Sequence, residues 1–326
     1  MSPQQAHVSP NVKTEGGEAI GTGRAQLSYV LITPARNEEA HIERTIASVV
    51  HQTIRPVKWV VVSDGSTDRT DEIVKLHMRT NEWIELVRMP ERPERSFAGK
   101  VRAFDAGAAR VRHLPYDVIG NLDADVSFEE DYIEYLLGKF VLYPRLGVAS
   151  TNHYEVSWEQ RPRYDYRFTS IEDVSGACQL FRRECFEAIG GYKPSRHGGV
   201  DLLATLSARM HGWETRTYTG RILIHHRLQG SAETHRLLVE FENGRKDYSH
   251  GGHPVWEVFR AAYRLTRKPY IIGGCLIFLG YLSALLTRAE KVFPSDVVRF
   301  RRMEQMSRLR ALFTVRRWVR RPQEQD

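Results

Sequence analysis

The sequence has few cysteines, and this scarcity limits the classes of protein that it can encode. Three occur among 326 residues, and Cys178, Cys185 and Cys275 form no Cys-x-x-Cys pair. A fold held together by disulfide bonds is therefore not expected, and a reducing, cytoplasmic environment is the default expectation. The N-terminus has no basic segment followed by an apolar one, so we expect no secretory signal.

Motifs of two common classes of nucleotide-binding enzyme are also missing. No Gly-x-Gly-x-x-Gly joins a predicted strand to a helix, because the glycine-rich stretch 16–23 lies near the N-terminus, which argues against a dehydrogenase. Glu94 stands where a P-loop ending in Gly99 and Lys100 would have its first glycine. What is present is a globular composition, with 41% hydrophobic and 27% charged residues, which excludes a disordered chain and a polytopic membrane protein.

From residue 29 onward, short apolar runs alternate with patterns typical of amphipathic helices. Strands are predicted at 29–33, 58–63, 83–89 and 117–122, and helices between them at 38–52, 67–81 and 98–112. Beyond residue 145 the pattern predicts strands at 148–156, 176–182, 215–219 and 221–225, and helices at 183–189 and 201–211. The alternation predicts right-handed βαβ crossovers and an α/β fold with a mainly parallel sheet sandwiched by helices.

Two acids follow the fourth predicted strand, at the edge where a parallel sheet binds its ligands. Asp123 and Asp125 are separated by one residue. Each can offer oxygen atoms to a hard divalent cation, which would leave other coordination positions for diphosphate oxygens and water. Pairs of acids are common in loops, but the position at the end of a buried strand favours a metal site.

A second polar turn, Asp64-Gly-Ser-Thr-Asp68, follows the second predicted strand. Ser66 or Thr67 would cap the helix that begins there. Asp64, at the strand end itself, can accept hydrogen bonds from the edge of a nucleobase, which would give base selectivity.

Several segments occur together and in order, and the set is similar to the inverting family 2 glycosyltransferases of GT-A fold. The motifs are Pro34-Ala-Arg-Asn-Glu38, Asp64-Gly-Ser-Thr-Asp-Arg-Thr70, Gly99-Lys100, Asp123-Ala-Asp125, Gly190-Gly191-Tyr192 and Asp201. Ser63 stands where the family often has a further Asp, and Val200 precedes Asp201 where the family has Glu-Asp. The Gln-x-x-Arg-Trp motif of processive synthases is absent, which argues against a cellulose-synthase-like polymerase.

The resemblance implies a nucleoside pocket and a nucleotide-sugar donor. Pro34, Arg36 and Glu38 would line this pocket, with Glu38 on the ribose, and Asp64 would contact the base. Lys100 would contact the nucleotide, with a solvated cation at a helix start as the simpler alternative. A UDP-sugar is expected in preference to a GDP-sugar.

The resemblance also implies a metal and an acceptor. Asp123 and Asp125 would bind the sugar diphosphate and its divalent cation, Mg²⁺ or Mn²⁺. The sugar would pass to a hydroxyl group of a glycan or a lipid-linked acceptor, in cell-surface glycan or glycolipid synthesis. We therefore expect a metal-dependent hexosyltransferase.

Asp201 opens the predicted helix 201–211 and has two possible roles. It is either an N-cap alone or the general base of the reaction. Inverting transfer needs a carboxylate opposite the leaving diphosphate, which takes the proton of the attacking hydroxyl group.

Two histidines end the strand predicted at 221–225. Because neighbouring side chains of a strand point to opposite faces, His225 and His226 do not easily bind one metal together. One of the two could supply an imidazole to the metal or a contact to the diphosphate, with His226 as the candidate metal ligand, and polar loop residues are the simpler alternative. Arg227 is a candidate for phosphate binding through its guanidinium fork.

Two rival functions use the same residues. Asp123-Ala-Asp-Val-Ser127 approximates the signature of aspartyl-phosphate phosphatases, in which the first Asp is the nucleophile. That motif normally opens its fold, whereas three βα units precede it here, and no later Gly-Asp-x-x-x-Asp cluster occurs. A non-catalytic nucleotide-sugar binding protein is the second rival, and the presence of every candidate carboxylate argues against it.

The chain divides into a flexible arm at 1–27, a catalytic domain at 28–250 and a helical C-terminal region at 251–326. From Tyr270 to Leu286, 17 residues carry no charge. From Arg288 onward there are eleven basic residues and five acids, which supplies six of the seven net positive charges. An apolar segment with a basic flank is typical of attachment to membrane lipid, and we expect no nucleic acid partner.

The length of this apolar segment bears on how it would meet the membrane. A helix of 17 residues is about 25 Å long, shorter than the ~30 Å hydrocarbon core. Basic residues lie on both sides, and a single crossing would place one cluster outside, against the positive-inside tendency. We therefore expect a peripheral or monotopic helix at the cytoplasmic face of the cell membrane, with a short span or a buried helix as alternatives. Gly273, Gly274 and Gly280 would permit a bend or a close helix contact.

Overall fold

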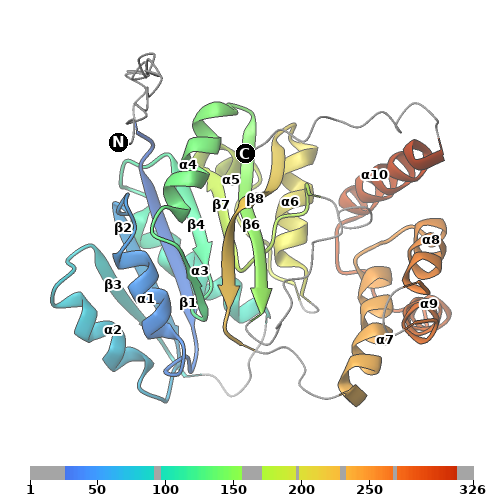
Figure 1. Cartoon of the computed structure of the whole chain (residues 1–326), viewed down its shortest axis with the longest axis horizontal. Coiled ribbons are helices and arrows are strands. Elements are labelled where there is room, and N and C mark those ends of the chain that lie inside the picture. Colours follow the sequence, from blue (N-terminus) through green and yellow to red (C-terminus); the bar gives the residue numbers. More distant parts are fainter. Residues whose placement is uncertain are drawn as a thin grey trace, which may run out of the picture.

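The structure is a computed structural model, and it describes residues 26–91, 97–155, 171–195, 198–227, 233–266 and 270–313. Within these ranges one sheet carries helices on both faces, and a group of further helices packs beside it (Figure 1). The predicted α/β fold is confirmed. The N-terminal arm and the end of the basic tail lie outside the described residues, apart from residues 26 and 27 of the arm.

The elements follow one another along the chain much as the sequence pattern predicts. The strands are β1 (Tyr29–Ala35), β2 (Lys58–Asp64), β3 (Ile84–Met89), β4 (Val118–Leu122), β5 (Val126–Phe128), β6 (Leu146–Glu155), β7 (Cys178–Arg182) and β8 (Glu214–His225). The helices are α1 (Ile42–Val50), α2 (Thr70–Met78), α3 (Phe97–Val111), α4 (Tyr132–Leu142), α5 (Arg183–Ala188), α6 (Val200–Met210), α7 (Glu233–Ser249), α8 (Pro254–Arg264), α9 (Ile272–Leu286) and α10 (Ser295–Phe313).

The sheet is parallel in its first half and mixed in its second. Its strand order is β3-β2-β1-β4-β7-β6-β8-β5. Strands β3, β2, β1 and β4 are parallel neighbours. β7 runs antiparallel to both β4 and β6, β6 pairs with β8 in parallel, and β5 pairs with β8 antiparallel. The carboxyl ends of β1, β2 and β4 therefore meet at one edge, as the alternating pattern predicts.

Both faces of the sheet are buried under helices, which explains the nearly continuous apolar runs of the central strands. Tyr29 and Leu31 of β1 pack on the face covered by α1, α2 and α4. Val30 and Ile32, which point the other way, pack on the face covered by α3, α5 and α6. The predicted sandwich of helix, sheet and helix follows from this two-residue alternation.

Two elements were not predicted from the sequence, and two predicted strands are one. β5 has three residues, too few for a recognisable pattern. α4 does bury residues at helical spacing, including Ile133, Leu137 and Phe140, so the sequence contains the pattern of this helix. The strands predicted at 215–219 and 221–225 form the single strand β8, with a register shift opposite Thr151 and Asn152.

The C-terminal helices pack closely through glycines. A Cβ atom added to Gly244 of α7 would lie 1.9 Å from the carbonyl oxygen of Ile277 in α9. A Cβ on Gly280 would lie 1.9 Å from the carbonyl oxygen of Phe241 in α7, and one on Gly274 would lie 2.5 Å from that of Ala261 in α8. The backbones of α7 and α9 therefore approach each other closely, which the absence of a side chain at these glycines permits. The prediction assigns α7 to the catalytic domain, but the helix packs against this C-terminal one.

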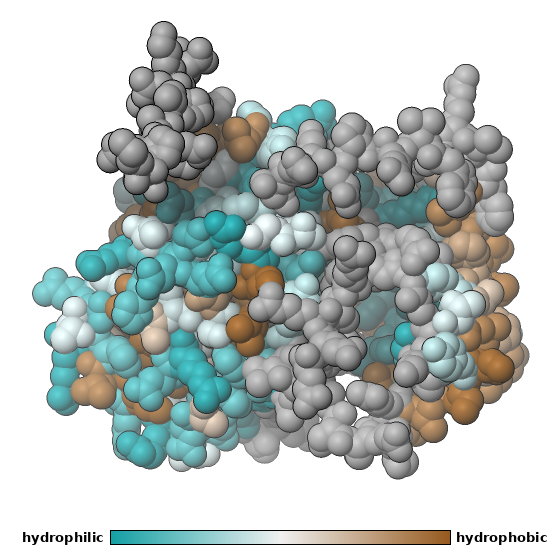
Figure 2. All heavy atoms as spheres, in the orientation of Figure 1, coloured by the Kyte–Doolittle hydropathy of each residue, from teal (hydrophilic) through white to brown (hydrophobic). Residues whose placement is uncertain are grey.

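Helix α9 is apolar on all sides but buried on only one. Gly274, Ile277 and Tyr281 face the neighbouring helices, whereas Ile272, Leu279 and Leu286 are exposed. Figure 2 shows apolar side chains gathered at the right edge of the molecule, where Figure 1 places α8 and α9. None of the helices in the described ranges has the length and hydropathy needed to cross a membrane.

Candidate active site

Two loops at the carboxyl ends of β1 and β2 are locked together by hydrogen bonds. The Oδ1 atom of Asn37 accepts from the backbone N–H of Thr67 at 2.9 Å. One carboxylate oxygen of Asp68 accepts from the N–H of Glu39 at 3.0 Å, and the other accepts from the N–H of Thr70 at 3.0 Å. The N-cap position of α2 is Arg69, so neither of the predicted caps, Ser66 or Thr67, occupies it, and Asp68 instead binds the N–H of the first helical residue.

Four predicted nucleoside residues lie at these two strand ends. Pro34 of β1 pairs with Val62 of β2, so the two ends are adjacent. Asp64 and Glu38 are buried, and Pro34 and Arg36 are half-buried. The structure thus brings the four residues into one region, and their roles in binding a nucleoside remain predictions.

The segment Asp123-Ala-Asp125 connects β4 to β5 and is pinned from α1. The buried hydroxyl group of Thr45 donates to the carbonyl oxygens of Ala124 and Val126, at 2.9 Å and 2.7 Å. The backbone N–H of Asp123 donates to the carbonyl oxygen of Ala177 at 2.9 Å. The backbone on both sides of the two acids is therefore fixed by the core of the domain.

Two cationic side chains pair with these acids. The Lys100 ammonium lies 2.5 Å from Oδ1 of Asp123. The guanidinium of Arg227 lies 3.2 Å from Oδ2 of Asp125 and forms a second ion pair with Glu38. Withdrawal from water raises the pKa of the Asp123 carboxyl group, and the neighbouring Lys100 offsets part of that rise.

A candidate metal site lies among Asp123, Asp125 and His225, which each offer one ligand atom within 4.8 Å of the others. Nδ1 of His225 lies 3.2 Å from the carbonyl oxygen of Arg227. Because a carbonyl only accepts hydrogen bonds, Nδ1 donates here, and in the neutral ring Nε2 has the lone pair that a cation would bind. Nε2 lies 3.4 Å from Oδ1 of Asp125, and a cation between these two electron-rich atoms would make the contact favourable.

The candidate metal site contains His225 in place of the predicted His226. The ring of His226 points away from the cluster, with Nε2 2.8 Å from the hydroxyl oxygen of Ser127 and Nδ1 3.3 Å from the Arg44 guanidinium. It also stacks on the ring of His41. The rule that neighbouring strand residues face opposite ways holds, and it sends His225, not His226, to the acids.

A pocket of about 280 Å³ adjoins the candidate metal site, and Asp201 stands in its wall. Its lining includes Lys100, Phe104, Asp123, Tyr192, Asp201 and His225. Oδ2 of Asp201 accepts from the N–H of Gly176 at 3.2 Å, and Oδ1 accepts from the N–H of Leu202 at 2.9 Å. The N-cap of α6 is Gly199, so Asp201 lies inside the first turn and the N-cap interpretation is not supported.

A buried hydrogen-bond network holds the turn that binds Asp201. The side-chain amide of Asn121 in β4 donates to the carbonyl oxygen of Gly176 at 2.7 Å. The Tyr192 hydroxyl donates to Oε1 of Gln179 at 2.6 Å, and the amide of Gln179 donates to the carbonyl oxygen of Val174 at 3.0 Å. Tyr192 belongs to the Gly-Gly-Tyr motif, whereas Asn121 and Gln179 have no motif by which sequence reasoning would find them.

Part of the chain is similar to a known protein family. Residues 30–190 match the protein family described as Glycosyl transferase family 2. Over 199 residues the chain is 31% identical to 4,4'-diaponeurosporenoate glycosyltransferase of Staphylococcus aureus (strain bovine RF122 / ET3-1), a match that covers 56% of this chain and 51% of that protein. The chain therefore spans about half the length of the curated relatives it matches.

Two solved structures have the same fold over most of the chain. Mannosyltransferase PcManGT from Pyrobaculum calidifontis, in complex with GDP-Man and Mn²⁺, has a TM-score of 0.52 and 18% identity, over 89% of this chain and 82% of its own. TarS 1-349 of S. aureus, in complex with UDP-GlcNAc, has a TM-score of 0.51 and 14% identity, over 80% and 73% of the two chains. At these identities the likeness concerns the fold alone.

These comparisons identify the class of protein. Residues 30–190 form a glycosyltransferase family 2 domain, and the fold is consistent with the GT-A type. The acids that suggested an aspartyl-phosphate phosphatase lie inside the matched region, so that alternative loses its support.

Proposed function

We propose that the protein is a metal-dependent, inverting glycosyltransferase that uses a nucleotide-diphosphate sugar. One observation carries the proposal. Asp123 and His225 of the candidate metal site and the carboxylate of Asp201 line the same pocket. A diphosphate bound at the metal and a hydroxyl group near Asp201 would then meet on opposite sides of a sugar held between them.

Asp201 would act as the general base. Its two oxygens are held by the N–H groups of Gly176 and Leu202, so the carboxylate is oriented before the substrate arrives. As the acceptor oxygen bonds to the anomeric carbon and the bond to the diphosphate breaks, Asp201 takes the hydroxyl proton. Attack opposite the leaving group inverts the configuration of that carbon.

The cationic side chains would serve the diphosphate. Lys100 and Arg227 pair with Asp123, Asp125 and Glu38. When a cation takes up the two acids, Lys100 and Arg227 can donate to phosphate oxygens instead. Bound there, the divalent cation would neutralise charge that develops on the departing diphosphate.

The ligand set favours Mn²⁺ over Mg²⁺. Mg²⁺ binds almost entirely through oxygen atoms, whereas a site with an imidazole nitrogen suits a softer transition metal. Two carboxylates and His225 leave open positions for diphosphate oxygens. We propose a UDP-sugar as the donor, and GDP-sugars belong in the same screen because the two similar structures contain UDP-GlcNAc and GDP-Man.

The test is release of nucleoside diphosphate from a panel of UDP- and GDP-sugars, with Mn²⁺, with Mg²⁺ and with EDTA. We expect EDTA to abolish transfer and Mn²⁺ to restore more of it than Mg²⁺. Asp125→Asn should lose roughly 10²-fold or more in turnover, because it removes one charged ligand from the metal. Full activity of the wild-type protein in EDTA would overturn the metal-dependent mechanism.

We also propose that the helical region attaches the enzyme to an anionic membrane surface, near a glycan or lipid-linked acceptor. The exposed side of α9 presents Ile272, Leu279 and Leu286, which are 53%, 50% and 75% exposed. Arg288 and Lys291, which follow this helix, are exposed as well. Apolar side chains beside exposed cations match the acyl boundary and the phosphate groups of a bilayer.

The attachment is tested by flotation with vesicles of phosphatidylglycerol and, separately, of phosphatidylcholine. We expect binding to the anionic vesicles that weakens with salt, and loss of binding in Ile272→Glu/Leu279→Glu. Leu76→Glu is the matched control, because Leu76 on α2 is 56% exposed but lies on the other side of the molecule (Figure 1). Equal flotation of the double variant and the wild-type protein would contradict the proposal.

A further inference from the structure

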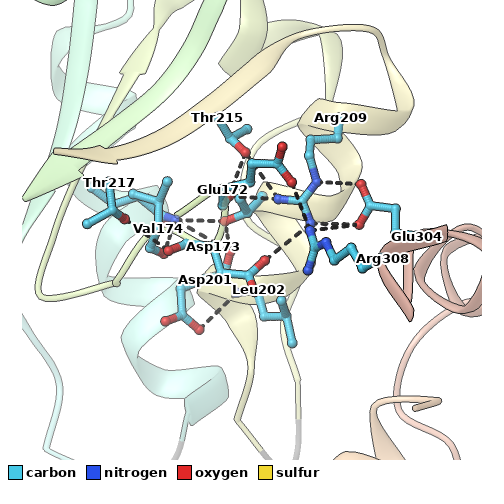
Figure 3. A network of polar contacts seen from close by, with 12 residues as sticks. Glu172, Asp173, Val174, Asp201, Leu202, Arg209, Thr215, Thr217, Glu304 and Arg308 are labelled. Carbon is cyan, nitrogen blue, oxygen red and sulfur yellow. Dashed lines mark hydrogen bonds and ion pairs between the residues drawn. The ribbon is translucent and has the colours of Figure 1, made fainter. Parts of the chain in front are cut away.

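Helix α6, whose first turn carries Asp201, lies between the sheet and the C-terminal helices. Leu203 and Leu206 pack against Phe293, Val297 and Val298, which precede or belong to α10. At the other end of α6, both Nε and Nη2 of Arg209 bond to the carboxylate of Glu304 in α10, at 2.8 Å and 2.9 Å (Figure 3). The C-terminal region is therefore joined to this helix along its length.

The turn that precedes Asp201 is in direct contact with His250, the residue that follows α7. Gly198 and Gly199 have left-handed backbone angles, with φ of 80° and 74°. A Cβ atom on Gly199 would lie 2.8 Å from both Nε2 and Cε1 of His250 and 3.1 Å from Cζ of Phe293. Two aromatic rings thus fill the space beside Gly199 that a side chain would otherwise occupy.

His250 is itself held firmly. Its ring stacks on Phe293, with centroids 4.7 Å apart and planes 7° apart, and only 9% of the residue is exposed. Its carbonyl oxygen accepts from Nη1 of Arg301 at 3.0 Å, and Nη2 of Arg301 bonds to Asp247 at 2.7 Å. The buried ion pair between α7 and α10 therefore fixes the residue that contacts the turn.

The His250 ring contacts the turn as an uncharged group. Burial, together with the charge of Arg301, lowers the pKa of His250 to about 4, so the ring is neutral near neutral pH. Nε2 has no hydrogen-bond partner among the described residues. A neutral ring beside a glycine can hold the backbone in place but does not supply a second charge to the reaction.

We propose that His250, stacked on Phe293, is a positioning residue that holds the Gly198–Gly199 turn and so places Asp201 in the pocket. The C-terminal helices then complete the acceptor side of the site in addition to any role at a membrane. This inference rests on the proposed function in one respect, which is the role of Asp201 as base. From inside the domain, Gly176 holds the carboxylate, and from outside, His250 holds the backbone that carries it.

The closing experiment compares His250→Ala, Gly199→Ala and the double variant with His211→Ala. His211 is a matched control because it is an exposed histidine at the opposite end of α6. For each protein, turnover, the dissociation constant of the nucleotide sugar, and peptide-level amide exchange are measured. His250→Gln, which retains bulk, replaces His250→Ala where the latter does not fold.

We expect His250→Ala to lower turnover about 10- to 100-fold, because displacement of a catalytic group by ~1 Å has an effect of that size. Donor affinity should stay unchanged, and exchange should rise in the peptides that contain Gly176 and Leu203 but not in α1. In Gly199→Ala the new methyl group meets His250, so its effect should be smaller in the His250→Ala background than alone.

Three results would overturn the proposal: normal turnover in His250→Ala, multiplicative effects in the double variant, or exchange that rises equally throughout the chain. The exchange measurement needs no substrate. If the wild-type protein transfers no sugar, the proposed function fails, whereas the support of the turn by His250 is still decided by the exchange data.

Discussion

The two sides of the pocket are built from different parts of the molecule. On the metal side, Asp123 and Asp125 follow a central strand and are fixed by Thr45 of α1, all within the family match at 30–190. On the opposite side, Asp201 lies beyond that match, on helix α6, whose N-cap Gly199 is contacted by His250 after α7 and Phe293 before α10. The first side is thus held within the α/β core, whereas the C-terminal helices contact the second.

The two sides of the pocket should therefore respond differently to substitution. Substitutions at the candidate metal site should weaken binding of the cation and the donor as well as lower turnover. Substitutions on the base side, including distant ones in the helices, should lower turnover while the donor still binds.

The largest effect is expected from Asp201→Asn, which keeps the shape of the side chain but cannot accept a proton. Turnover should fall roughly 10²- to 10⁴-fold while donor affinity is retained. Asp296→Asn is the matched control, because Asp296 also lies in the first turn of a helix, α10, and is exposed. Normal turnover in Asp201→Asn would mean that the base lies elsewhere.

The two adjacent histidines provide a test of the metal side. His225→Ala should weaken Mn²⁺ binding about 10- to 100-fold, since it removes one of three ligand groups. His226→Ala should leave Mn²⁺ affinity unchanged, because its ring contacts Ser127 and Arg44 instead. Titration of Mn²⁺ by calorimetry measures both, and a loss confined to His226→Ala would reverse the assignment.

The same division explains what the sequence alone could predict. Apolar runs and helical spacing are local, so the parallel strands and the acids at their ends were predictable. The choice between His225 and His226 was not, because it depends on β5, whose Val126 pairs with His225. A strand of three residues leaves no pattern, and without it the register of β8 is unknown.

Contacts between distant segments were also beyond the sequence. His250 lies 51 positions from Gly199 in the chain and carries no motif. Its contact depends on how the segment after α7 packs against α10, where a Cβ atom on Gly251 would lie 2.5 Å from Val298. The predicted helix in segment 270–286 is present as α9, and of the bend or close contact expected at its glycines, Gly274 and Gly280 make close contacts.

A smaller effect is expected where α6 joins α10. Glu304→Gln leaves the buried guanidinium of Arg209 without one of its two carboxylate partners, and Asp173 remains 3.2 Å away. We expect the free energy of unfolding to fall by about 2–3 kcal/mol. Glu72→Gln, in an exposed pair with Arg69, should change it by no more than about 0.5 kcal/mol. Urea unfolding measures both, and equal effects would show that the join contributes nothing specific.

The smallest effect concerns pH and two buried groups of the helices that support the base side. The pKa of His250 is lowered to about 4 from an ordinary value of about 6.5, so the unfolded chain binds this proton first and stability is lost as pH falls through that range. Burial raises the pKa of Glu257 to about 7, against the pull of Arg260, so the folded chain holds this proton and gains stability as pH falls.

The two contributions to the free energy of unfolding have opposite pH dependence and partly cancel in the wild-type protein. Single variants should therefore show each contribution separately. Between roughly pH 7 and pH 5.5, the free energy of unfolding of Glu257→Gln should fall by about 1 kcal/mol, because only the His250 contribution remains. Over the same range the free energy of unfolding of His250→Gln should rise by about 1 kcal/mol, because only the Glu257 contribution remains. Urea unfolding at both pH values measures the difference. Parallel pH dependence in the two variants would mean that these groups do not titrate in the folded helices as their burial requires.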